Sequence, residues 1–193
     1  RRMIGREVLS ICPDQCFNLH ASLLPKFRGR APLNWALVEG ASETGVTLHH
    51  MTMEPDAGDI VAQIPLPIDD ADTAATLTEQ MVAATGQLLA KALPAIGDGS
   101  FSATPQDPAA ATVFPGRSPA DGLIDWDRSA TEIRNLIRAV THPWPGAFTW
   151  AGEREVKIWN ATATTGGHGE TPGTVISTTP LTISCGEGTL QID

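Results

Sequence analysis

The sequence predicts an α/β core followed by a small antiparallel β subdomain, and three observations support this fold class. Short apolar strands alternate with helical segments over residues 4–96. A stretch rich in Ala and Pro follows at residues 97–119, as is typical of a domain boundary. Beyond it, one helix precedes several short strands that Gly and polar turns separate. We therefore expect a first domain at 1–97, a linker at 98–118 and a β subdomain at 119–193.

The first domain opens with a helical segment at residues 4–11 that Pro13 and Asp14 end, and a short strand follows at 16–19. A short helix is predicted at 32–39, with a proline near its start, where a missing N–H costs little. Further strands are predicted at 45–51 and 60–68. Two prolines in the second of these indicate an edge strand.

A long helix completes the first domain. Asp72 or Thr73 caps its amino-terminal end, and it reaches about residue 96. Its predicted apolar face consists of Leu77, Met81, Leu88, Leu89 and Leu93.

The second domain is predicted to combine one helix with a small antiparallel barrel. Ser129 and Glu132 have the spacing of a capping box, which opens a helix. Its apolar residues Ile133, Leu136, Ile137 and Val140 share one face. The predicted strands are 147–150, 155–159, 173–177, 181–184 and 189–192.

A group of polar residues in the first domain suggests catalysis. Side chains alternate along a strand, so Asn18 and His20 project from the same face. A histidine can carry or release a proton near neutral pH, and Asp56 in a later turn would hold its tautomer and favour imidazolium. The Asn18 amide would donate to a developing oxyanion. If these groups converge, the first chemistry to consider is acyl transfer.

Each of these residues also has an ordinary structural interpretation. A single histidine after a strand is often only hydrogen-bonded, and Asp56-Ala57-Gly58-Asp59 is a plausible turn. His49 and His50 point to opposite faces of a strand, which favours packed or solvated side chains over metal ligands. The basic residues Lys26, Arg28 and Arg30 form either an ordinary solvated loop or a site for an anion such as a diphosphate.

Taken together, the motifs resemble those of the 10-formyltetrahydrofolate-dependent formyltransferases. That family has an Asn-x-His strand end that runs into Ser-Leu-Leu-Pro-x-x-Arg-Gly, then a Thr-Gly-Val-Thr strand and an Asp-x-Gly-x-Ile loop. The matching segments are Asn18 to His20, Ser22 to Gly29, Glu43 to Thr47, Asp56 to Ile60, Ile124 to Trp126 and Pro143 to Phe148.

The resemblance implies a fold, a co-substrate and roles for individual residues. The fold would be a Rossmann-like core, whose amino-terminal part is missing from this chain, followed by an OB-like subdomain that is itself incomplete. His20 would mediate proton transfer, Asn18 would stabilise the tetrahedral oxyanion, and Asp56 would favour the protonated imidazole. The co-substrate would be 10-formyltetrahydrofolate, with no metal. Residues matching the formylfolate site are Arg30, Thr52, Met53, Glu54, Pro55 and Asp56, together with Arg2, Met3 and Ile4.

The formyl acceptor is expected to be the amine of a nucleotide-linked amino sugar. Residues 29–35, 45–49 and 143–148 are similar to the sugar branch of the family. The nearest likeness is to the formyltransferase domain of bifunctional polymyxin-resistance enzymes, which formylates UDP-4-amino-4-deoxy-L-arabinose for lipid A modification. The formal net charge is −9, and no basic stripe suited to tRNA is visible. Methionyl-tRNA therefore stays the first alternative acceptor, and an inactive fragment or a formyltetrahydrofolate hydrolase is the second.

Composition is consistent with a cytoplasmic location. Hydrophobic residues make up 41% of the chain, enough for a core, and no apolar run approaches the ~20 residues of a membrane span. Three cysteines without a Cys-x-x-Cys pair indicate reduced thiols. We expect no membrane insertion; a fused domain and a homo-oligomer both remain open for the whole protein.

Overall fold

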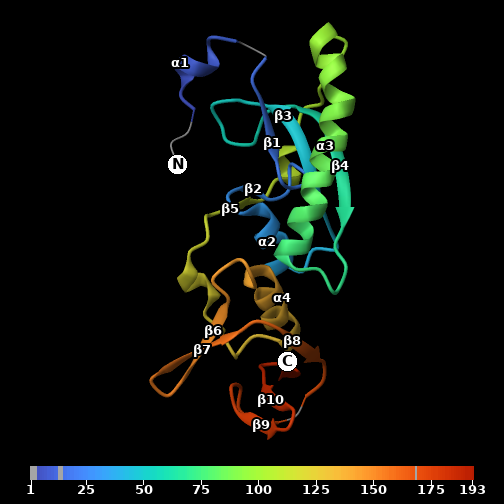
Figure 1. The fold of residues 1–193 in the computed structure, drawn as a ribbon. Coiled ribbons are helices and arrows are strands. Elements are labelled where there is room, and N and C mark those ends of the chain that lie inside the picture. The colour runs from blue at the N-terminus through green and yellow to red at the C-terminus, as the bar shows by residue number, and fades with distance from the viewer. Residues whose placement is uncertain (1–3, 13–14, 168) are drawn as a thin grey trace. The chain divides into compact units, whose positions relative to one another are not determined.

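The structure is a computed structural model that describes residues 4–12, 15–167 and 169–193 (Figure 1). The chain divides into two compact units, which are described separately. The N-terminal unit comprises Arg1–Ala36, Ser42–Asp69 and Leu77–Gly116. The C-terminal unit comprises Leu37–Ala41, Asp70–Thr76 and Arg117–Asp193.

A three-stranded antiparallel sheet organises the N-terminal unit. Its strands are β1 (Phe17–His20), β3 (Glu43–His50) and β4 (Ile60–Pro67), in the order β1-β3-β4. The prolines of β4 predicted an edge strand, and β4 occupies an edge of this sheet. A helix of one turn, α1 (Arg6–Leu9), precedes the sheet. Pro13 and Asp14, the predicted end of that helix, lie outside the described residues.

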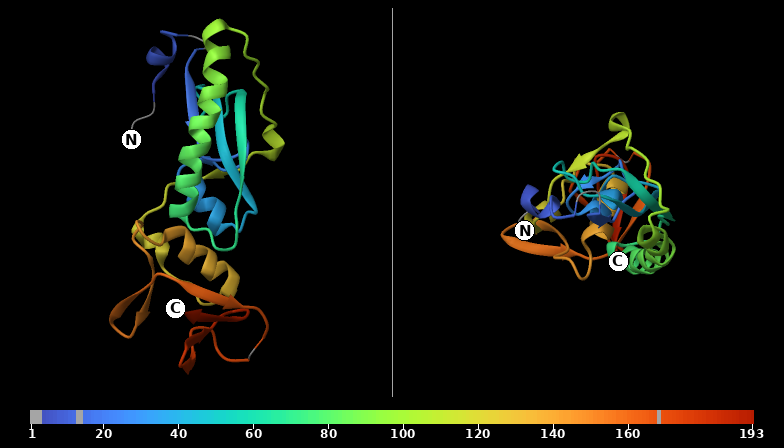
Figure 2. Two further views of the ribbon diagram at one scale, coloured as in Figure 1. Left: turned by 45° about the vertical axis from the view of Figure 1, so that its right-hand side comes forward. Right: turned by 90° about the horizontal axis from the view of Figure 1, so that it is seen from above.

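Two helices, α2 (Pro32–Val38) and α3 (Ala74–Asp98), follow the predicted ranges closely, and α3 runs alongside the sheet (Figures 1 and 2). The α3 cap is formed by Thr73, whose Oγ1 accepts from the Thr76 N–H at 3.3 Å. Thr76 Oγ1 in turn donates to Asp72 Oδ1 at 2.7 Å.

The buried face of α3 differs from the predicted one at its carboxy-terminal end. Leu93 is 55% exposed, so its assignment to the apolar face is wrong. At 100° per residue it lies roughly 160° around the helix from Leu77. Two alanines, Ala84 and Ala92, complete the buried face. The buried residues of this face are Leu77, Met81, Ala84, Leu88 and Ala92.

The predicted loose stretch after α3 is partly held by backbone pairing. Thr104 pairs with Ile60 in an isolated bridge, and β5 (Val113–Phe114) pairs in parallel with β2 (Arg28–Gly29). Between them lies the short 3₁₀ helix η1 (Pro108–Ala110). We call residues 104–114 the strap. The composition rich in Ala and Pro predicted that this stretch has no long regular element. It could not predict the pairing, because the partner strands lie far away in the sequence.

In the C-terminal unit, η2 (Pro119–Gly122) precedes α4 (Ala130–Val140). The predicted capping box is present: Ser129 Oγ accepts from the Glu132 N–H at 3.2 Å, and Glu132 Oε2 accepts from the Ser129 N–H at 3.0 Å. Ile133, Ile137 and Val140 are buried as predicted, whereas Leu136 is only half-buried.

The β strands of this unit confirm a small antiparallel β subdomain, built as two sheets. Four strands, in the order β8-β11-β10-β9, form one sheet. Their ranges are β8 (Ala161–Thr164), β9 (Val175–Thr178), β10 (Leu181–Ser184) and β11 (Thr189–Ile192). The hairpin of β6 (Ala147–Ala151) and β7 (Arg154–Ile158) forms the other. Strand β8 was not predicted, because its Ala-Thr-Ala-Thr sequence has no large apolar residue to reveal the alternation.

No helix within the described ranges is long and apolar enough to cross a membrane.

Candidate active site

His20 is the last residue of β1 and is 6% exposed. Its Nε2 lies 2.8 Å from the carbonyl oxygen of Phe27, and its Nδ1 lies 3.5 Å from Asp56 Oδ1. Because a carbonyl only accepts hydrogen bonds, we assign a proton to Nε2. Nδ1 is therefore the ring nitrogen that can gain or lose a proton, and it faces a carboxylate.

Asp56 sits in a tight turn that aims its two carboxylate oxygens in different directions. Its φ is +56°, in the left-handed region, where Asp is tolerated better than most residues. Oδ1 faces His20, and Oδ2 accepts the backbone N–H of Gly29 at 2.9 Å. A Cβ at Gly58 would lie 2.0 Å from the carbonyl oxygen of His50, so the turn requires glycine there. This close approach gives the Asp-x-Gly motif a physical reason.

Asn18 pairs with His49, for which the sequence favours a packed or solvated side chain with no part in a site. The two residues are partners in the β1–β3 register, and Asn18 Nδ2 lies 3.2 Å from His49 Nε2. His49 Nδ1 donates to the carbonyl oxygen of His50 at 2.7 Å, so Nε2 is left to accept from the amide. This bond fixes which way the Asn18 carboxamide points and leaves its second N–H for another acceptor.

The charge state of His49 follows from its burial. It is 2% exposed, and desolvation lowers the pKa of its imidazole below the ordinary value, although the His50 carbonyl and Asp56 act in the opposite direction. His49 is therefore neutral near pH 7 and suited to accept a hydrogen bond. Its Nε2 also lies 3.7 Å from Asp56 Oδ1, which places both histidines around one carboxylate oxygen. The sequence indicated only that His49 lies in a strand, where side chains alternate between the two faces; it did not show that His49 lies opposite Asn18.

A small cavity of about 160 Å³ opens beside this cluster. Asn18, His49 and Asp56 line it. His20 does not line it and lies behind Asp56, next to that carboxylate. The remaining lining residues are Ile4, Met51, Thr52 and Pro55. Of the predicted folate-contacting residues, Ile4, Thr52, Pro55 and Asp56 thus meet at one cavity.

Three other predicted folate-contacting residues, all within the described part of the chain, do not line this cavity. Met53 and Glu54 are exposed, and so is Arg30, whose guanidinium lies against Gly116. Arg2 and Met3 lie outside the described residues.

The basic loop also differs from a simple anion site. Arg28 is 7% exposed, and both its Nε and its Nη2 donate to Gln106 Oε1, at 3.1 Å and 2.7 Å. Its Nη1 lies 3.7 Å from Glu54 Oε1. Arg28 is thus occupied within the unit, and Lys26 and Arg30 are the exposed cations of the run.

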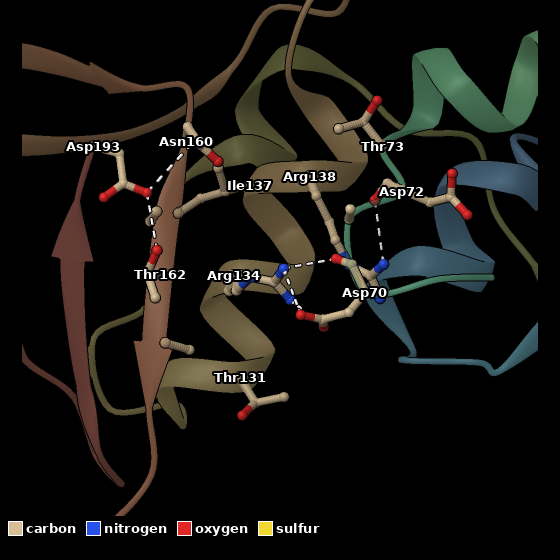
Figure 3. A pocket seen from close by; sticks show the side chains of 13 residues that line it. Asp70, Asp72, Thr73, Thr131, Arg134, Ile137, Arg138, Asn160, Thr162 and Asp193 are labelled. Atoms are coloured by element: carbon tan, nitrogen blue, oxygen red, sulfur yellow. Dashed lines mark hydrogen bonds and ion pairs between the residues drawn. The ribbon is translucent and has the colours of Figure 1, made fainter.

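A second and larger pocket, of about 530 Å³, lies within the C-terminal unit (Figure 3). Arg134 forms its main ion pair, with Nη1 2.6 Å from Asp70 Oδ1 and Nη2 donating to the Asp70 carbonyl at 2.6 Å. Arg138 donates to the carbonyl oxygen of Asp72 at 3.3 Å. The charges of Arg134 and Asp70 thus compensate each other within this pocket.

Comparisons with known proteins bear on both units. Residues 1–93 match the model of the family described as formyl transferase, and residues 117–193 match the model described as formyl transferase, C-terminal domain. These matches confirm the predicted fold class, a Rossmann-like formyltransferase core followed by a small β domain.

Three solved structures illustrate the similarity. An N-formyltransferase from Helicobacter canadensis, in complex with folinic acid and dTDP-3-aminofucose, is 24% identical, with a TM-score of 0.76 over 93% of this chain and 66% of its own. HypX from Aquifex aeolicus, in complex with tetrahydrofolic acid, is 25% identical, with a TM-score of 0.72 over 100% of this chain and 33% of its own.

A methionyl-tRNA formyltransferase from Clostridium thermocellum is 22% identical, with a TM-score of 0.64 over 84% of this chain and 68% of its own. The chain thus spans about two thirds of the Helicobacter protein and a third of HypX.

Proposed function

Because the chain belongs to the formyltransferase family, we propose that its protein transfers a formyl group from 10-formyltetrahydrofolate to the amine of a nucleotide-linked amino sugar. The observation that carries this proposal is the cluster of Asn18, His20 and Asp56, with His49 as a fourth member. The cluster offers a neutral amide donor beside a carboxylate and an imidazole, which is what transfer of an acyl group to an amine requires.

The residues have distinct roles in this proposal. The acceptor nitrogen attacks the formyl carbon, and the formyl oxygen becomes an oxyanion that receives the second N–H of Asn18. The nitrogen then loses a proton to the pair formed by Asp56 Oδ1 and His20 Nδ1. The same pair returns a proton to the leaving nitrogen as its bond to the formyl carbon breaks. The products are a formamide and tetrahydrofolate.

Burial gives this cluster its effect. His20 and His49 are almost fully enclosed. Of the proposed trio, Asn18 and Asp56 border the cavity and His20 does not. In a site from which water is excluded, a fixed donor stabilises developing charge more strongly than water would. His20 Nε2–H donates a hydrogen bond to the carbonyl oxygen of Phe27. In this proposal the proton that moves during the reaction is therefore carried by Nδ1, which faces Asp56.

The cavity fits the reacting end of a formylfolate, and not the whole molecule. At about 160 Å³ it is smaller than the roughly 300–1,000 Å³ typical of drug-sized ligands. Asn18 provides the donor for a formyl oxygen, while Thr52 and Pro55 line the remaining wall. We infer that Arg30, Met53 and Glu54, which are exposed, contact parts of the folate outside this cavity. For Arg2 and Met3 we propose a folate contact on the family motif alone.

The sugar acceptor is favoured by charge and by similarity. The net charge of −9 does not suit a surface for tRNA phosphates. The Helicobacter structure contains a nucleotide-linked amino sugar, and its match extends over 93% of this chain. Within that class we propose UDP-4-amino-4-deoxy-L-arabinose, on the sequence motifs at residues 29–35 and 143–148, and a cytoplasmic reaction.

The test uses the full-length protein that contains this chain. It is supplied with 10-formyltetrahydrofolate and, in parallel, UDP-4-amino-4-deoxy-L-arabinose, a dTDP-linked 3-amino sugar or methionyl-tRNA, and release of tetrahydrofolate is followed. Turnover with the UDP sugar alone supports the full proposal. Turnover with the dTDP sugar alone keeps the reaction and changes the sugar.

The remaining outcomes overturn the proposal. Turnover with methionyl-tRNA alone would assign the protein to translation initiation. Release of tetrahydrofolate without any acceptor amine would indicate a formyltetrahydrofolate hydrolase. If no substrate is turned over, the protein is inactive as a formyltransferase.

A further inference from the structure

Gln106 lies in the strap, fifty residues after Asp56, and every hydrogen-bonding group of its side chain is used. Its Nε2 donates to the carbonyl oxygens of Asp56 and Gly58, each at 2.7 Å. Its Oε1 accepts from Nε and Nη2 of Arg28, at 3.1 Å and 2.7 Å. A primary amide has two donor hydrogens and one acceptor oxygen with two lone pairs, so these four contacts satisfy it completely.

These contacts hold the turn that carries Asp56. The left-handed conformation at Asp56 is unfavourable for a residue with a Cβ, so the surrounding contacts must maintain it. Gln106 bonds the carbonyls on both sides of Ala57 and thereby clamps the turn across its width. The carboxylate can then face His20 with Oδ1 while Oδ2 receives the Gly29 N–H.

The strap also supports the histidine side of the cluster. The carbonyl oxygen of Thr112 accepts the Arg28 N–H at 2.8 Å, and Thr112 Oγ1 accepts the Phe27 N–H at 2.8 Å. Phe27, like Asp56, has a positive φ, and its carbonyl oxygen accepts from His20 Nε2. One segment of chain therefore fixes the backbone beside both His20 and Asp56.

We propose that Gln106 is a positioning residue for Asp56: it holds the Asp56–Gly58 turn so that the carboxylate faces His20. The inference rests on the proposed function for its effect on rate, but its effect on the turn is independent of any substrate. Misplacing a catalytic group by about 1 Å can cost as much as ~10²-fold in rate.

The experiment compares Gln106→Glu and Gln106→Met with Gln87→Met, a matched control on an exposed position of α3. Glu keeps an acceptor for Arg28 but loses both donors to the turn, whereas Met loses all four bonds at similar size. For both variants we expect kcat per folded enzyme to fall ~10–100-fold, with little change in the KM of the amine, and the pH profile of kcat to shift. The control should match the unsubstituted protein.

A second measurement is independent of activity. The Gly29 amide hydrogen bonds to Asp56 Oδ2, so its hydrogen-exchange rate reports where the carboxylate lies. We expect exchange at Gly29 to accelerate at least ~10-fold in both Gln106 variants and not in the control. Unchanged exchange and an unchanged kcat and pH profile, with only a lower melting temperature, would reduce Gln106 to a structural residue and overturn the inference.

The two measurements distinguish the failure of each proposal. If the full-length protein transfers no formyl group, the proposed function is wrong, and Gly29 exchange still decides the positioning role. If transfer occurs and Gly29 exchange does not respond to the Gln106 variants, only the positioning role is wrong.

Discussion

Two polar clusters, one in each unit, use similar ingredients to different ends. Around Asp56 in the N-terminal unit, the neighbours of the carboxylate are two buried histidines and a backbone N–H. Around Asp70 in the C-terminal unit, the neighbour is Arg134, which holds the carboxylate by two bonds (Figure 3). An arginine keeps its charge at all working pH values, so the second pair is fixed, whereas histidines can exchange protons.

The difference indicates which of the two clusters is the better candidate for proton-transfer chemistry. Asp70 is highly exposed on its side-chain atoms, 90%, and its pair with Arg134 is screened by water. The Asp56 side chain is only 14% exposed. Its partners are two imidazoles and a backbone N–H, and none of them carries the permanent charge of an arginine. A reactive cluster therefore needs burial and partners that can titrate, while an ion pair needs neither.

The largest effect that this comparison predicts is for His20→Ala. General acid–base catalysis contributes ~10²–10⁴-fold, so kcat should fall by that factor, while the melting temperature changes little beyond the loss of packing. His142→Ala, in the C-terminal unit, is the matched control. A near-normal kcat for the His20 variant in the full-length protein would sink the proposed mechanism.

Asn18→Ala should have the next largest effect. Loss of one oxyanion donor lowers kcat by ~10²–10³-fold, because the donor acts mainly on charge that develops in the transition state. Steady-state kinetics on the full-length protein would measure this, with the KM of the formyl donor as the second readout. A rise in KM at constant kcat would instead mean that Asn18 only binds substrate.

His49→Gln should change how stability depends on pH. Burial lowers the pKa of His49 in the folded state, so below the unfolded value of about 6.5 the unfolded state binds more protons than the folded one. The free energy of unfolding is therefore fully maintained above about pH 6.5 and decreases as pH falls toward the lowered pKa of the folded state.

The glutamine variant lacks this proton uptake. Its stability should therefore decrease less steeply than that of the unsubstituted protein as the pH falls below about 6.5, measured by urea unfolding at each pH. Parallel curves for the two proteins would show that His49 does not titrate differently on folding.

Arg134→Ala should have the smallest effect. An exposed ion pair is worth ~0.2–1 kcal/mol, so the free energy of unfolding should fall by no more than that, and kcat should not change. Arg154→Ala, at an exposed position, is the control. A tenfold loss of kcat in the Arg134 variant would mean that the two clusters do not differ in the way described above.

Local patterns in the sequence were enough for most elements of both units. The capping box at Ser129 and the threonine cap at Thr73 depend on residues three positions apart, so they are legible in any stretch of sequence. The pleat of β1 likewise placed Asn18 and His20 on one face. The family motifs then indicated Asp56 as their partner, and the structure sets its Oδ1 3.5 Å from His20. The roles of these three residues remain proposals.

Tertiary structure alone decided the partners that hold the cluster. Whether His49 is a spectator or a neighbour of Asn18 depends on the pairing register of β1 with β3, which no local pattern determines. The same holds for Gln106, which reaches Asp56 from a stretch whose composition predicted only a loose boundary. Arg28, the centre of an apparent anion site, is occupied for the same reason. Side-chain hydrogen bonds between distant segments form only after the chain has folded, and so the sequence determined the reactive groups while the fold determined their orientation.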